Sequence, residues 1–323
     1  MTLRSLIAGI GGYLPERVLD NPALARAHGL DTTDEWIVER TGIRRRHIAA
    51  PGETASAMGA AAARAALAHA GLPAEAVDLV VVATATPDSA FPATAVRIQG
   101  ALGIARGFAF DVSAACTGFI YALGIADSLI RTGQARCALV IGTEIYSRIL
   151  DWTDRGTCVL FGDGAGAVVL AATEAKDGRG ILSTHLHSDG RHGDILQVEG
   201  GAGSTGGAGL LRMAGKEVFR HAVSKLAAVV DEALAANGLG HEDVRWLVPH
   251  QANRRIIDAM GRKLKLPPER VVVTVDRHAN TSAASIPLAL ADAVATGRLE
   301  RGDLIVMEAI GGGLTWGAAL ARY

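Results

Sequence analysis

The stretch FAFDVSAACTGFIYALGIADSLIR, residues 108–131, decides the fold class. Its first five residues are mostly apolar and predict a buried strand that ends at residue 112. From Cys116 onward, the run stays apolar as far as Arg131 and is typical of a packed helix. A strand that turns directly into an apolar helix is the building block of an α/β fold with a mainly parallel sheet.

The same alternation continues outward from this stretch in both directions. In the first half we expect strands at 3–9, 79–84 and 137–142, an edge strand at 164–171, and helices at 54–69 and 93–103. In the second half we expect strands at 181–185, 245–248, 271–273, 304–308 and 318–322, and helices at 214–237, 253–264 and 281–296. This repeated rhythm predicts two similar halves, 1–173 and 174–323, joined by an exposed connection within 173–180. The glycine-rich segment 199–209 is expected to be a mobile surface loop.

Composition narrows the class of function. The 323 residues carry 32 Lys+Arg against 33 Asp+Glu, so no basic field exists to hold nucleic acid or an anionic membrane. The three cysteines, 116, 137 and 158, fit neither a disulfide scaffold nor a metal or redox spacing. With no export signal and no apolar run near the roughly 20 residues of a membrane span, we expect a cytoplasmic protein.

Cys116 is the first candidate for chemistry. It lies where the strand of residues 108–112 gives way to the helix, so its sulfur is expected near unpaired helix N–H groups. Such a position stabilises a thiolate and raises the population of the nucleophile without a dedicated base. The alternative is a small core residue, which is the usual role of a free cysteine and the one we assign to Cys137 and Cys158.

Two further segments carry polar groups at strand ends. His250 ends an apolar strand and is followed by Asn253, a cap for the next helix, while Asn280 precedes another apolar helix. A histidine in such a place is as often a satisfied structural donor, and Asn280 could be only a helix cap. The run Gly311-Gly312-Gly313 follows a strand, so its backbone N–H groups could bind an oxyanion, although a glycine turn between strands is also a common structural device.

The chain resembles the β-ketoacyl-acyl carrier protein synthase III family of the thiolase superfamily. Besides the segments around Cys116, His250, Asn280 and the glycine turn, DEWIVERTGIR at 34–44 and FGDGAGA at 161–167 occur in the family's order and spacing. This resemblance covers almost the whole chain. It implies an α/β, thiolase-like fold in which two similar βαβαβαββ halves form five layers, α-β-α-β-α.

The resemblance also implies a reaction. Cys116 is then the nucleophile that accepts a short acyl group from acetyl-CoA or a similar thioester. His250 and Asn280 bind the carbonyl of malonyl-acyl carrier protein and stabilise the enolate formed as carbon dioxide leaves, for which fixed hydrogen-bond donors are more useful than a base. The N–H groups of Cys116 and Gly312 form the oxyanion hole. Coenzyme A enters as substrate, with no tightly bound cofactor and no metal.

Binding roles follow from the same resemblance. A planar guanidinium and an indole can sandwich a base, so the coenzyme A contacts are expected from Trp36 and Arg155 around adenine and from Arg40 and Arg255 near the phosphates. The acyl pocket is lined by Phe91, Val159 and Leu160, with Phe91 crossing a homodimer interface into the partner. Contacts with the acyl carrier protein come from Gln251, Arg255, Arg262 and Lys263. The chain departs from the family pattern at Lys216, where asparagine is expected, and at Ala279, where glycine is expected.

Other functions are also compatible with these residues. A relative with the same Cys-His-Asn set could make a specialised metabolite or transfer the acyl group without condensation, and a silent acyl-thioester binding module would keep the pocket without chemistry. A nicotinamide enzyme is rejected because the Gly-rich run 162–166 leads into a strand, whereas a dinucleotide loop opens a helix. The basic run 44–47 is interpreted as a solvated loop.

Overall fold

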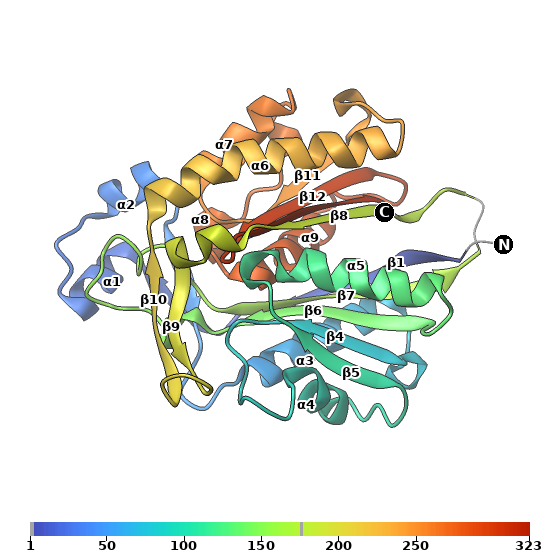
Figure 1. The fold of residues 1–323 in the computed structure, drawn as a ribbon, viewed down its shortest axis with the longest axis horizontal. Coiled ribbons are helices and arrows are strands. Elements are labelled where there is room, and N and C mark those ends of the chain that lie inside the picture. Colours follow the sequence, from blue (N-terminus) through green and yellow to red (C-terminus); the bar gives the residue numbers. More distant parts are fainter. Residues whose placement is uncertain (1–2, 175–176) are drawn as a thin grey trace.

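Five layers make up the molecule in the computed structural model, which describes residues 3–174 and 177–323. Two β-sheets lie on either side of a central layer formed by two helices, and further helices cover the outer face of each sheet (Figure 1). This is the α-β-α-β-α arrangement implied by the resemblance. Buried aliphatic side chains fill the space between layers, so the central helices are apolar nearly all round.

The first sheet is mixed rather than mainly parallel. Its strands, in spatial order, are β1 (Arg4–Tyr13), β7 (Gly164–Thr173), β6 (Cys137–Glu144), β4 (Leu79–Ala83) and β5 (Phe108–Val112). β4 runs parallel to β5 and β6, but β7 is antiparallel to both β6 and β1. The prediction of an edge strand at 164–171 was therefore wrong. No helix crossover separates β6 from β7, so β7 returns antiparallel and is covered by β1.

The second sheet repeats this order with one strand fewer. It contains β11 (Trp246–Pro249), β12 (Leu304–Gly311), β13 (Thr315–Arg322) and β8 (Gly180–Ser188). β11 and β12 are parallel, and the other two pairs are antiparallel, as in the first sheet. The division into 1–173 and 174–323 stays a prediction, because residues 175–176 of the expected connection lie outside the described residues.

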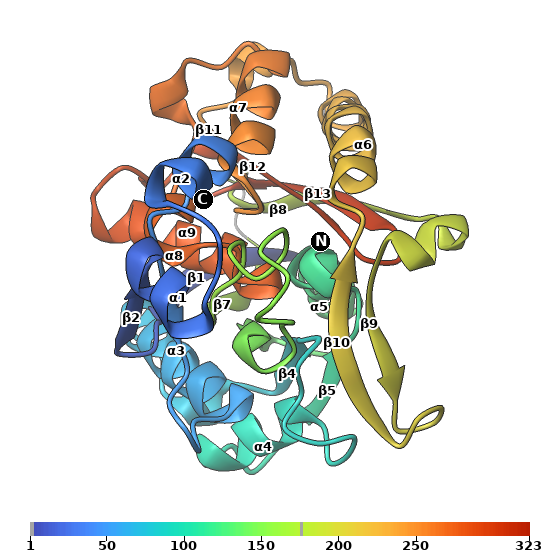
Figure 2. The same cartoon turned by 90° about the vertical axis from the view of Figure 1, so that its left-hand side faces the viewer.

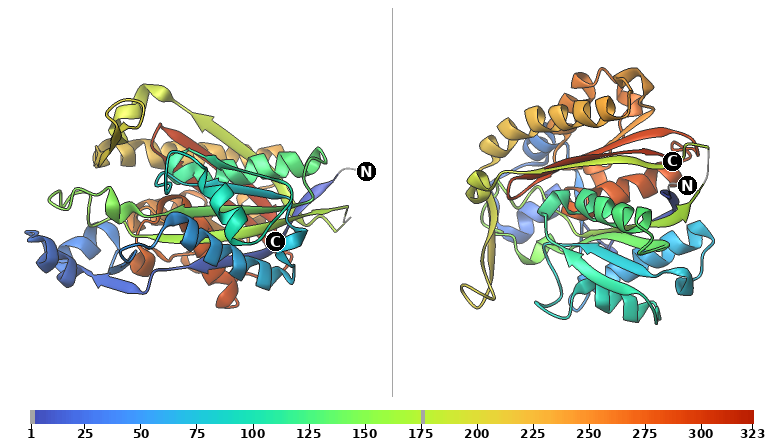
Figure 3. Two further views of the ribbon diagram at one scale, coloured as in Figure 1. Left: turned by 90° about the horizontal axis from the view of Figure 1, so that it is seen from below. Right: turned by 45° about the vertical axis from the view of Figure 1, so that its right-hand side comes forward.

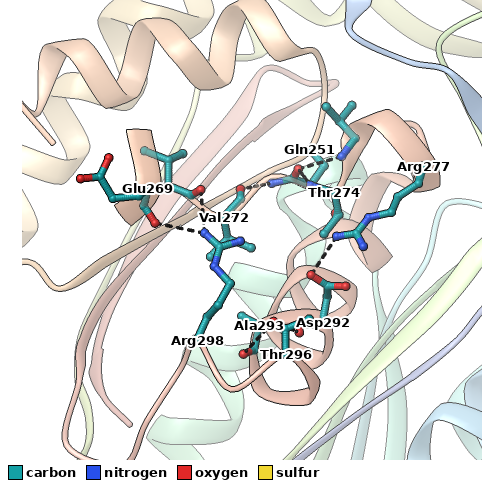
Figure 4. Close-up of polar contacts among 11 residues, drawn as sticks. Gln251, Glu269, Val272, Thr274, Arg277, Asp292, Ala293, Thr296 and Arg298 are labelled. Atoms are coloured by element: carbon teal, nitrogen blue, oxygen red, sulfur yellow. Dashed lines mark hydrogen bonds and ion pairs between the residues drawn. The ribbon is translucent and has the colours of Figure 1, made fainter. Parts of the chain in front are cut away.

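The strand expected at 271–273 is reduced to one bridge, Val271 to Leu247. The amide of Gln251 occupies the pairing positions that a strand would need, donating to Val272 O at 3.1 Å and accepting from Thr274 N at 2.7 Å (Figure 4). Arg298 holds the same segment from the other side by donating to Val271 O at 3.3 Å. The segment is thus fixed by side chains instead of a ladder, which is why an apolar run alone predicted it wrongly.

Six long helices complete the layers. The outer pair on the first sheet is α3 (Ala55–Ala70) and α4 (Thr94–Ala101), the outer pair on the second is α6 (Gly215–Ala236) and α7 (Arg254–Lys263), and the central pair is α5 (Gly118–Arg131) and α9 (Ser285–Ala295). The expected ends of α3 are confirmed: Thr54 accepts from Ala57 N, and Gly71 closes the helix at φ 65°.

The remaining elements gather at the end of the molecule away from the N-terminus (Figures 2 and 3). They are β2 (Arg17–Asp20), α1 (Asn21–His28), α2 (Asp34–Thr41), β3 (Arg45–Ile48), β9 (Leu196–Gly201) and β10 (Gly207–Met213), with the short α8 (Val275–His278) nearby. Short 3-10 turns are η1 (Ala74–Ala76), η2 (Ala115–Thr117), η3 (Tyr146–Arg148), η4 (Gly190–Ile195), η5 (His241–Asp243), η6 (Pro268–Arg270) and η7 (Ser282–Ala284).

The glycine-rich segment 199–209 is not a loop but the tip of the β9–β10 hairpin. Gly200 and Gly206 take positive φ values of 74° and 81°, and the Thr205 hydroxyl accepts from Gly201 N and donates to Gly207 O. The glycines thus make a tight turn possible. Composition alone suggested mobility because it cannot show that the two flanking runs pair with each other.

Candidate active site

Cys116 lies in the η2 turn, directly before α5. The turn is held by hydrogen bonds between the two halves: Thr117 Oγ1 donates to Thr315 O at 3.0 Å, and Thr315 Oγ1 donates to Ala114 O at 3.0 Å. Ala115 adopts φ 46°, a left-handed conformation that is costly for alanine. The surroundings therefore force a backbone that places the thiol at the end of the helix.

The thiol itself is 5% exposed, and this burial has a chemical consequence. Desolvation raises the pKa of Cys116 to about 12, although hydrogen bonds from Ser282 and Tyr146 oppose the rise. The expectation that the helix end alone would favour a thiolate was thus wrong for the buried site. The resting group is a thiol, and its deprotonation depends on donors placed around the sulfur.

His250 follows the end of β11 and is fixed through its Nδ1 atom. Nδ1 lies 2.6 Å from Ser285 Oγ, and Ser285 Oγ also accepts from Gln251 N at 3.3 Å. The Ser285 hydroxyl carries one proton that it can donate to Nδ1, and in that arrangement the imidazole proton lies on Nε2. Burial lowers the pKa of His250 to about 3, so the ring is neutral at physiological pH and acts as a donor.

Asn280 is fixed through its oxygen. Its Oδ1 accepts from Ser282 N at 2.8 Å, and its backbone N–H donates to Leu160 O at 2.9 Å. This geometry is a local turn rather than a cap of α9, whose cap residue is Ala284. Because Oδ1 is already used, the amide group offers its Nδ2 donors to the cavity that it lines.

The glycine turn packs directly against the nucleophile turn. A Cβ atom on Gly311 would lie 2.6 Å from Cys116 N, and one on Gly312 would lie 2.6 Å from Leu196 O. Only glycine permits backbones to approach this closely. The arrangement brings the end of β12 against the backbone N–H group of Cys116.

A cavity of ≈ 930 Å³ joins these parts. It is lined by most of the residues singled out from sequence: Trp36, Arg40, Cys116, Val159, Leu160, His250, Arg255, Asn280 and Gly312, together with Lys216. Residues from both halves of the chain therefore meet in one site. Its remaining walls come from the β9–β10 hairpin and the first turn of α6, including Leu196, Val198, Leu211, Met213 and Phe219.

At one side of this cavity, Trp36 carries two guanidinium groups. The Arg40 guanidinium carbon lies 4.4 Å from the indole centroid and that of Arg155 lies 5.1 Å from it. Arg155 does not line the cavity. It contacts Trp36, and its guanidinium donates a hydrogen bond to the backbone oxygen of Asp31. A flat indole flanked by planar cations is suited to stacking on a nucleobase and to contacting phosphates.

Besides Arg155, four residues predicted from sequence lie outside the cavity. Phe91 is 85% exposed on the loop between β4 and α4, while Arg262 and Lys263 are exposed in the last turn of α7. Gln251 is only 1% exposed, and its amide is engaged with Pro249, Val272, Thr274 and Val275. The prediction of a carrier-protein contact at Gln251 is therefore corrected: it is a buried brace.

Sequence reasoning missed the second layer of the site. Ser285 holds His250, and Ser282 and Tyr146 lie beside the thiol, with Tyr146 stacked on Phe161 at 4.9 Å between ring centroids. The polar run around Asn280 contained a signal for the two serines. Tyr146 had none, since only folding brings η3 to Cys116.

Residues 3–174 and 177–323 contain neither a membrane-spanning helix nor a metal-binding cluster. Across this part of the chain, no helix has the length and apolar character needed to span a membrane. In the same part, no cluster of three or more His, Cys, Asp or Glu side chains is arranged to bind a metal ion.

A buried thiol that faces two fixed donors in a five-layer fold defines an acyl-transferring condensing enzyme of the thiolase type. Comparisons with known proteins agree. The family model for 3-oxoacyl-[acyl-carrier-protein] synthase III matches residues 110–190, and the model for its C-terminal part matches residues 234–323.

Relatives and solved structures extend the likeness over the whole chain. The β-ketoacyl-[acyl-carrier-protein] synthase III of Rhodospirillum centenum is 67% identical, covering 100% of both chains, and that of Acidiphilium cryptum is 66% identical, covering 99% of both. The crystal structure of the Aquifex aeolicus enzyme superposes with a TM-score of 0.93 at 48% identity, covering 99% of this chain and 100% of that one. The chain belongs to the β-ketoacyl-acyl carrier protein synthase III family.

Proposed function

We propose that this enzyme transfers a short acyl group from coenzyme A to Cys116 and condenses it with malonyl-acyl carrier protein, so initiating fatty-acid synthesis in the cytoplasm. The observation that carries the assignment is the meeting of Cys116, His250 and Asn280 in one cavity. The outward-facing atoms of His250 and Asn280 are donors because Ser285 and Ser282 already hold their other polar atoms.

In the first half-reaction, the Cys116 sulfur attacks the thioester carbonyl, and the carbon–sulfur bond to coenzyme A then breaks. Negative charge develops on the carbonyl oxygen and is stabilised by the N–H groups of Cys116 and Gly312. The close packing of Gly311 on Cys116 N supports this role. The thiol proton ends on the departing coenzyme A.

In the second half-reaction, the malonyl thioester carbonyl accepts hydrogen bonds from His250 Nε2 and Asn280 Nδ2. Loss of carbon dioxide leaves an enolate whose oxygen these donors stabilise, and its carbon attacks the acyl group on Cys116. A neutral histidine suits this task because its Nε2–H donates a hydrogen bond to the enolate oxygen without transferring the proton to it. Its low pKa, caused by burial, supports the assignment.

Coenzyme A binding is assigned to the Trp36 platform. The adenine is proposed to lie against Trp36 and Arg155, with Arg40 and Arg255 near the phosphates. The guanidinium groups of Arg40 and Arg155 already adjoin the indole, at 4.4 and 5.1 Å from its centroid, which supports a shared binding surface. Lys216 lines the cavity where the family pattern has asparagine, and it adds a positive charge beside the path of an anionic substrate.

The proposed acyl carrier protein surface is basic and lies on α7. Arg255, Arg262 and Lys263 are exposed on this helix, and carrier proteins of this pathway are generally acidic. The double substitution Arg262→Glu with Lys263→Glu should raise KM for malonyl-acyl carrier protein in a salt-sensitive way while leaving acylation from acetyl-CoA unchanged. Arg64→Glu, on α3 in the opposite outer layer, is the matched control.

A homodimer is proposed through the free edge of β5. Phe91, Val96 and Phe108 are exposed apolar residues around this edge, and an open edge strand invites pairing. Phe91 would then close the partner's acyl pocket and favour short primers. Phe91→Ala should shift activity toward longer acyl chains, measured together with sedimentation velocity. An unchanged chain-length profile in a dimeric, active variant would remove this role.

The assignment as a whole is tested by mass spectrometry. Incubation with acetyl-CoA should add one acetyl group at Cys116, and addition of malonyl-acyl carrier protein should give acetoacetyl-acyl carrier protein and carbon dioxide. A silent binding module gains no acetyl group. A specialised acyltransferase is acetylated but forms no condensed product with the malonyl carrier.

A further inference from the structure

Two hydroxyl groups lie beside the thiol and have no part in the roles described above. Ser282 Oγ is 3.4 Å from Cys116 Sγ and 2.9 Å from the Tyr146 hydroxyl, which also hydrogen-bonds to Cys116. All three side chains are buried. They form a triangle of polar groups beside the cavity, which Cys116 and Tyr146 line.

The positions of both hydroxyls are fixed by structure. Ser282 opens η7 at φ 51°, with its N–H bound to Asn280 Oδ1. Tyr146 lies in η3, and its ring stacks on Phe161 at 4.9 Å and an interplanar angle of 21°. Holding a serine at positive φ costs free energy, so the surrounding structure determines where its hydroxyl points.

The proton count shows what the pair can do. Each hydroxyl carries one proton and can also accept one. If Tyr146 donates to Ser282, the serine proton is directed at the sulfur. If Ser282 instead donates to Tyr146, the phenol proton is directed at the sulfur. Burial raises the pKa of Tyr146 well above its usual value, so the phenol keeps its proton and remains a donor.

The other titratable groups near the sulfur do not supply this help. Glu144, at the end of β6, accepts from Thr86 Oγ1 at 2.7 Å and from Ala85 N at 3.0 Å and is also hydrogen-bonded to Ser282. Burial raises its pKa to about 7, and its negative charge opposes thiolate formation. Burial keeps His250 neutral, so it adds no positive charge beside the sulfur, and its proposed donor role is toward the malonyl carbonyl. The hydroxyls are therefore the side-chain donors that favour a negative sulfur.

We propose that Tyr146 and Ser282 form a donor pair that stabilises negative charge on the Cys116 sulfur. The pair acts when the sulfur attacks coenzyme A thioester and again in condensation, when the acyl carbon–sulfur bond breaks and the sulfur takes the electron pair. Neither hydroxyl is acylated, and neither gains or loses a proton over a turnover. The inference rests on the proposed role of Cys116 as nucleophile.

The test is the rate at which iodoacetamide alkylates Cys116, followed by peptide mass spectrometry so that Cys137 and Cys158 are counted separately. Tyr146→Phe keeps the ring and its stacking on Phe161, and Ser282→Ala removes the other hydroxyl. Each variant should alkylate about 10-fold or more slowly than the parent at neutral pH, since a hydrogen bond to a charged group is lost. Comparing Tyr146→Phe with the parent at every pH cancels the titration of Glu144, whereas Ser282→Ala also removes a hydrogen bond to Glu144.

Tyr121→Phe is the matched control, because it removes a hydroxyl that donates to His187 O at 2.8 Å on the same helix as the thiol turn. It should alkylate at the parent rate. Parent rates for both Tyr146→Phe and a folded Ser282→Ala overturn the inference, and if Ser282→Ala does not fold, Tyr146→Phe decides alone. Failure of the parent to be acetylated by acetyl-CoA would instead refute the proposed function.

Discussion

The nucleophile turn and the Asn280 turn occupy matching places in the two halves of the chain. Each leads through a 3-10 turn into a central helix: η2 includes Cys116, and η7 begins two residues after Asn280. Each 3-10 turn contains a residue other than glycine at positive φ, Ala115 at 46° and Ser282 at 51°. Each packs on a strand glycine of the opposite half. Gly311 receives Cys116 N, and Gly142 receives Ala283 O.

The difference between the turns lies in the side chains they present. One turn presents a thiol whose chemistry is covalent, while the other presents an amide whose chemistry is hydrogen bonding. The same backbone arrangement thus supplies both half-reactions of the proposed mechanism. The following predictions separate what each turn contributes, beginning with the largest effect.

The largest effect is expected from removing the functional side chain of each turn. Cys116→Ala should abolish acetylation, because no other group can form the thioester. Asn280→Ala should accept the acetyl group at the parent rate but lose roughly 10²–10³ in decarboxylation, the typical cost of removing one such donor. Mass spectrometry and carbon dioxide release measure the two steps. Cys137→Ala is the control and should acetylate normally, and stoichiometric acetylation of Cys116→Ala would contradict the comparison.

Adding one methyl group at either strand glycine should disturb the opposite turn. Gly311→Ala pushes against Cys116 and should impair acetylation first, whereas Gly142→Ala pushes against Ala283 and should impair decarboxylation first. Each should lower the free energy of unfolding by roughly 1–3 kcal/mol in urea titrations. Gly100→Ala on α4 meets open space and should not destabilise the protein, since alanine is also the better helix former. Equal losses in both half-reactions for both variants would show that the turns are not separable.

Glu308 on β12, next to the Gly311 end of the strand, gives a pH test. Burial raises the pKa of Glu308 to about 8, and neither carboxyl oxygen has a hydrogen-bond partner among the described residues. Since the unfolded group ionises near 4.5, its stabilising contribution is complete below pH 4.5 and is lost as pH rises toward 8.

Relative to Glu308→Gln, the parent should lose stability by about 1.4 kcal/mol for each pH unit across that window. Urea titrations of both proteins at several pH values measure the difference. Glu308→Gln keeps the shape of the side chain and removes the titration, so parallel pH curves for the two proteins would mean that Glu308 ionises normally.

The smallest effect concerns a strain present in only one turn. Ala279, directly before Asn280, adopts φ 57° and ψ −163°, a conformation suited to glycine, which the family pattern led us to expect there. Ala279→Gly should relieve this strain and raise the free energy of unfolding by about 1 kcal/mol. The greater freedom of glycine in the unfolded chain offsets part of that gain. Ala63→Gly within α3, at helical backbone angles, should instead lose about 1 kcal/mol. A loss at Ala279 equal to that at Ala63 would show that the position is unstrained.

Several parts of the fold could be predicted because they depend on local pattern. Apolar runs gave most strands of both sheets and the six long helices, and capping residues gave the ends of α3. Features that depend on which segments lie next to each other were predicted wrongly. The edge position of β7, the strand at 271–273 and the loop at 199–209 each required knowledge of what lies beside the segment.

Arg46 shows the same limit at a single residue. It belongs to a basic run interpreted as a solvated loop, yet it is 0% exposed and donates to Leu19 O, Asn21 Oδ1 and Val159 O. These hydrogen bonds offset the cost of burying the charge, although the Nε of Arg46 has no partner among the described residues, and the acceptors come from distant segments. Charge patterning in the sequence contains no record of them.

Local sequence was enough to indicate which groups could react: a cysteine and an asparagine that precede apolar helices, a histidine at a strand end, and a glycine turn. Those choices follow from local chemistry and from spacing along the chain. Only the three-dimensional arrangement shows that burial keeps Cys116 a thiol and His250 neutral. It also shows that Ser285 lies beside His250 and that Ser282 and Tyr146 lie beside Cys116. The reason is physical: desolvation and hydrogen bonding act through space, between residues that the sequence keeps far apart.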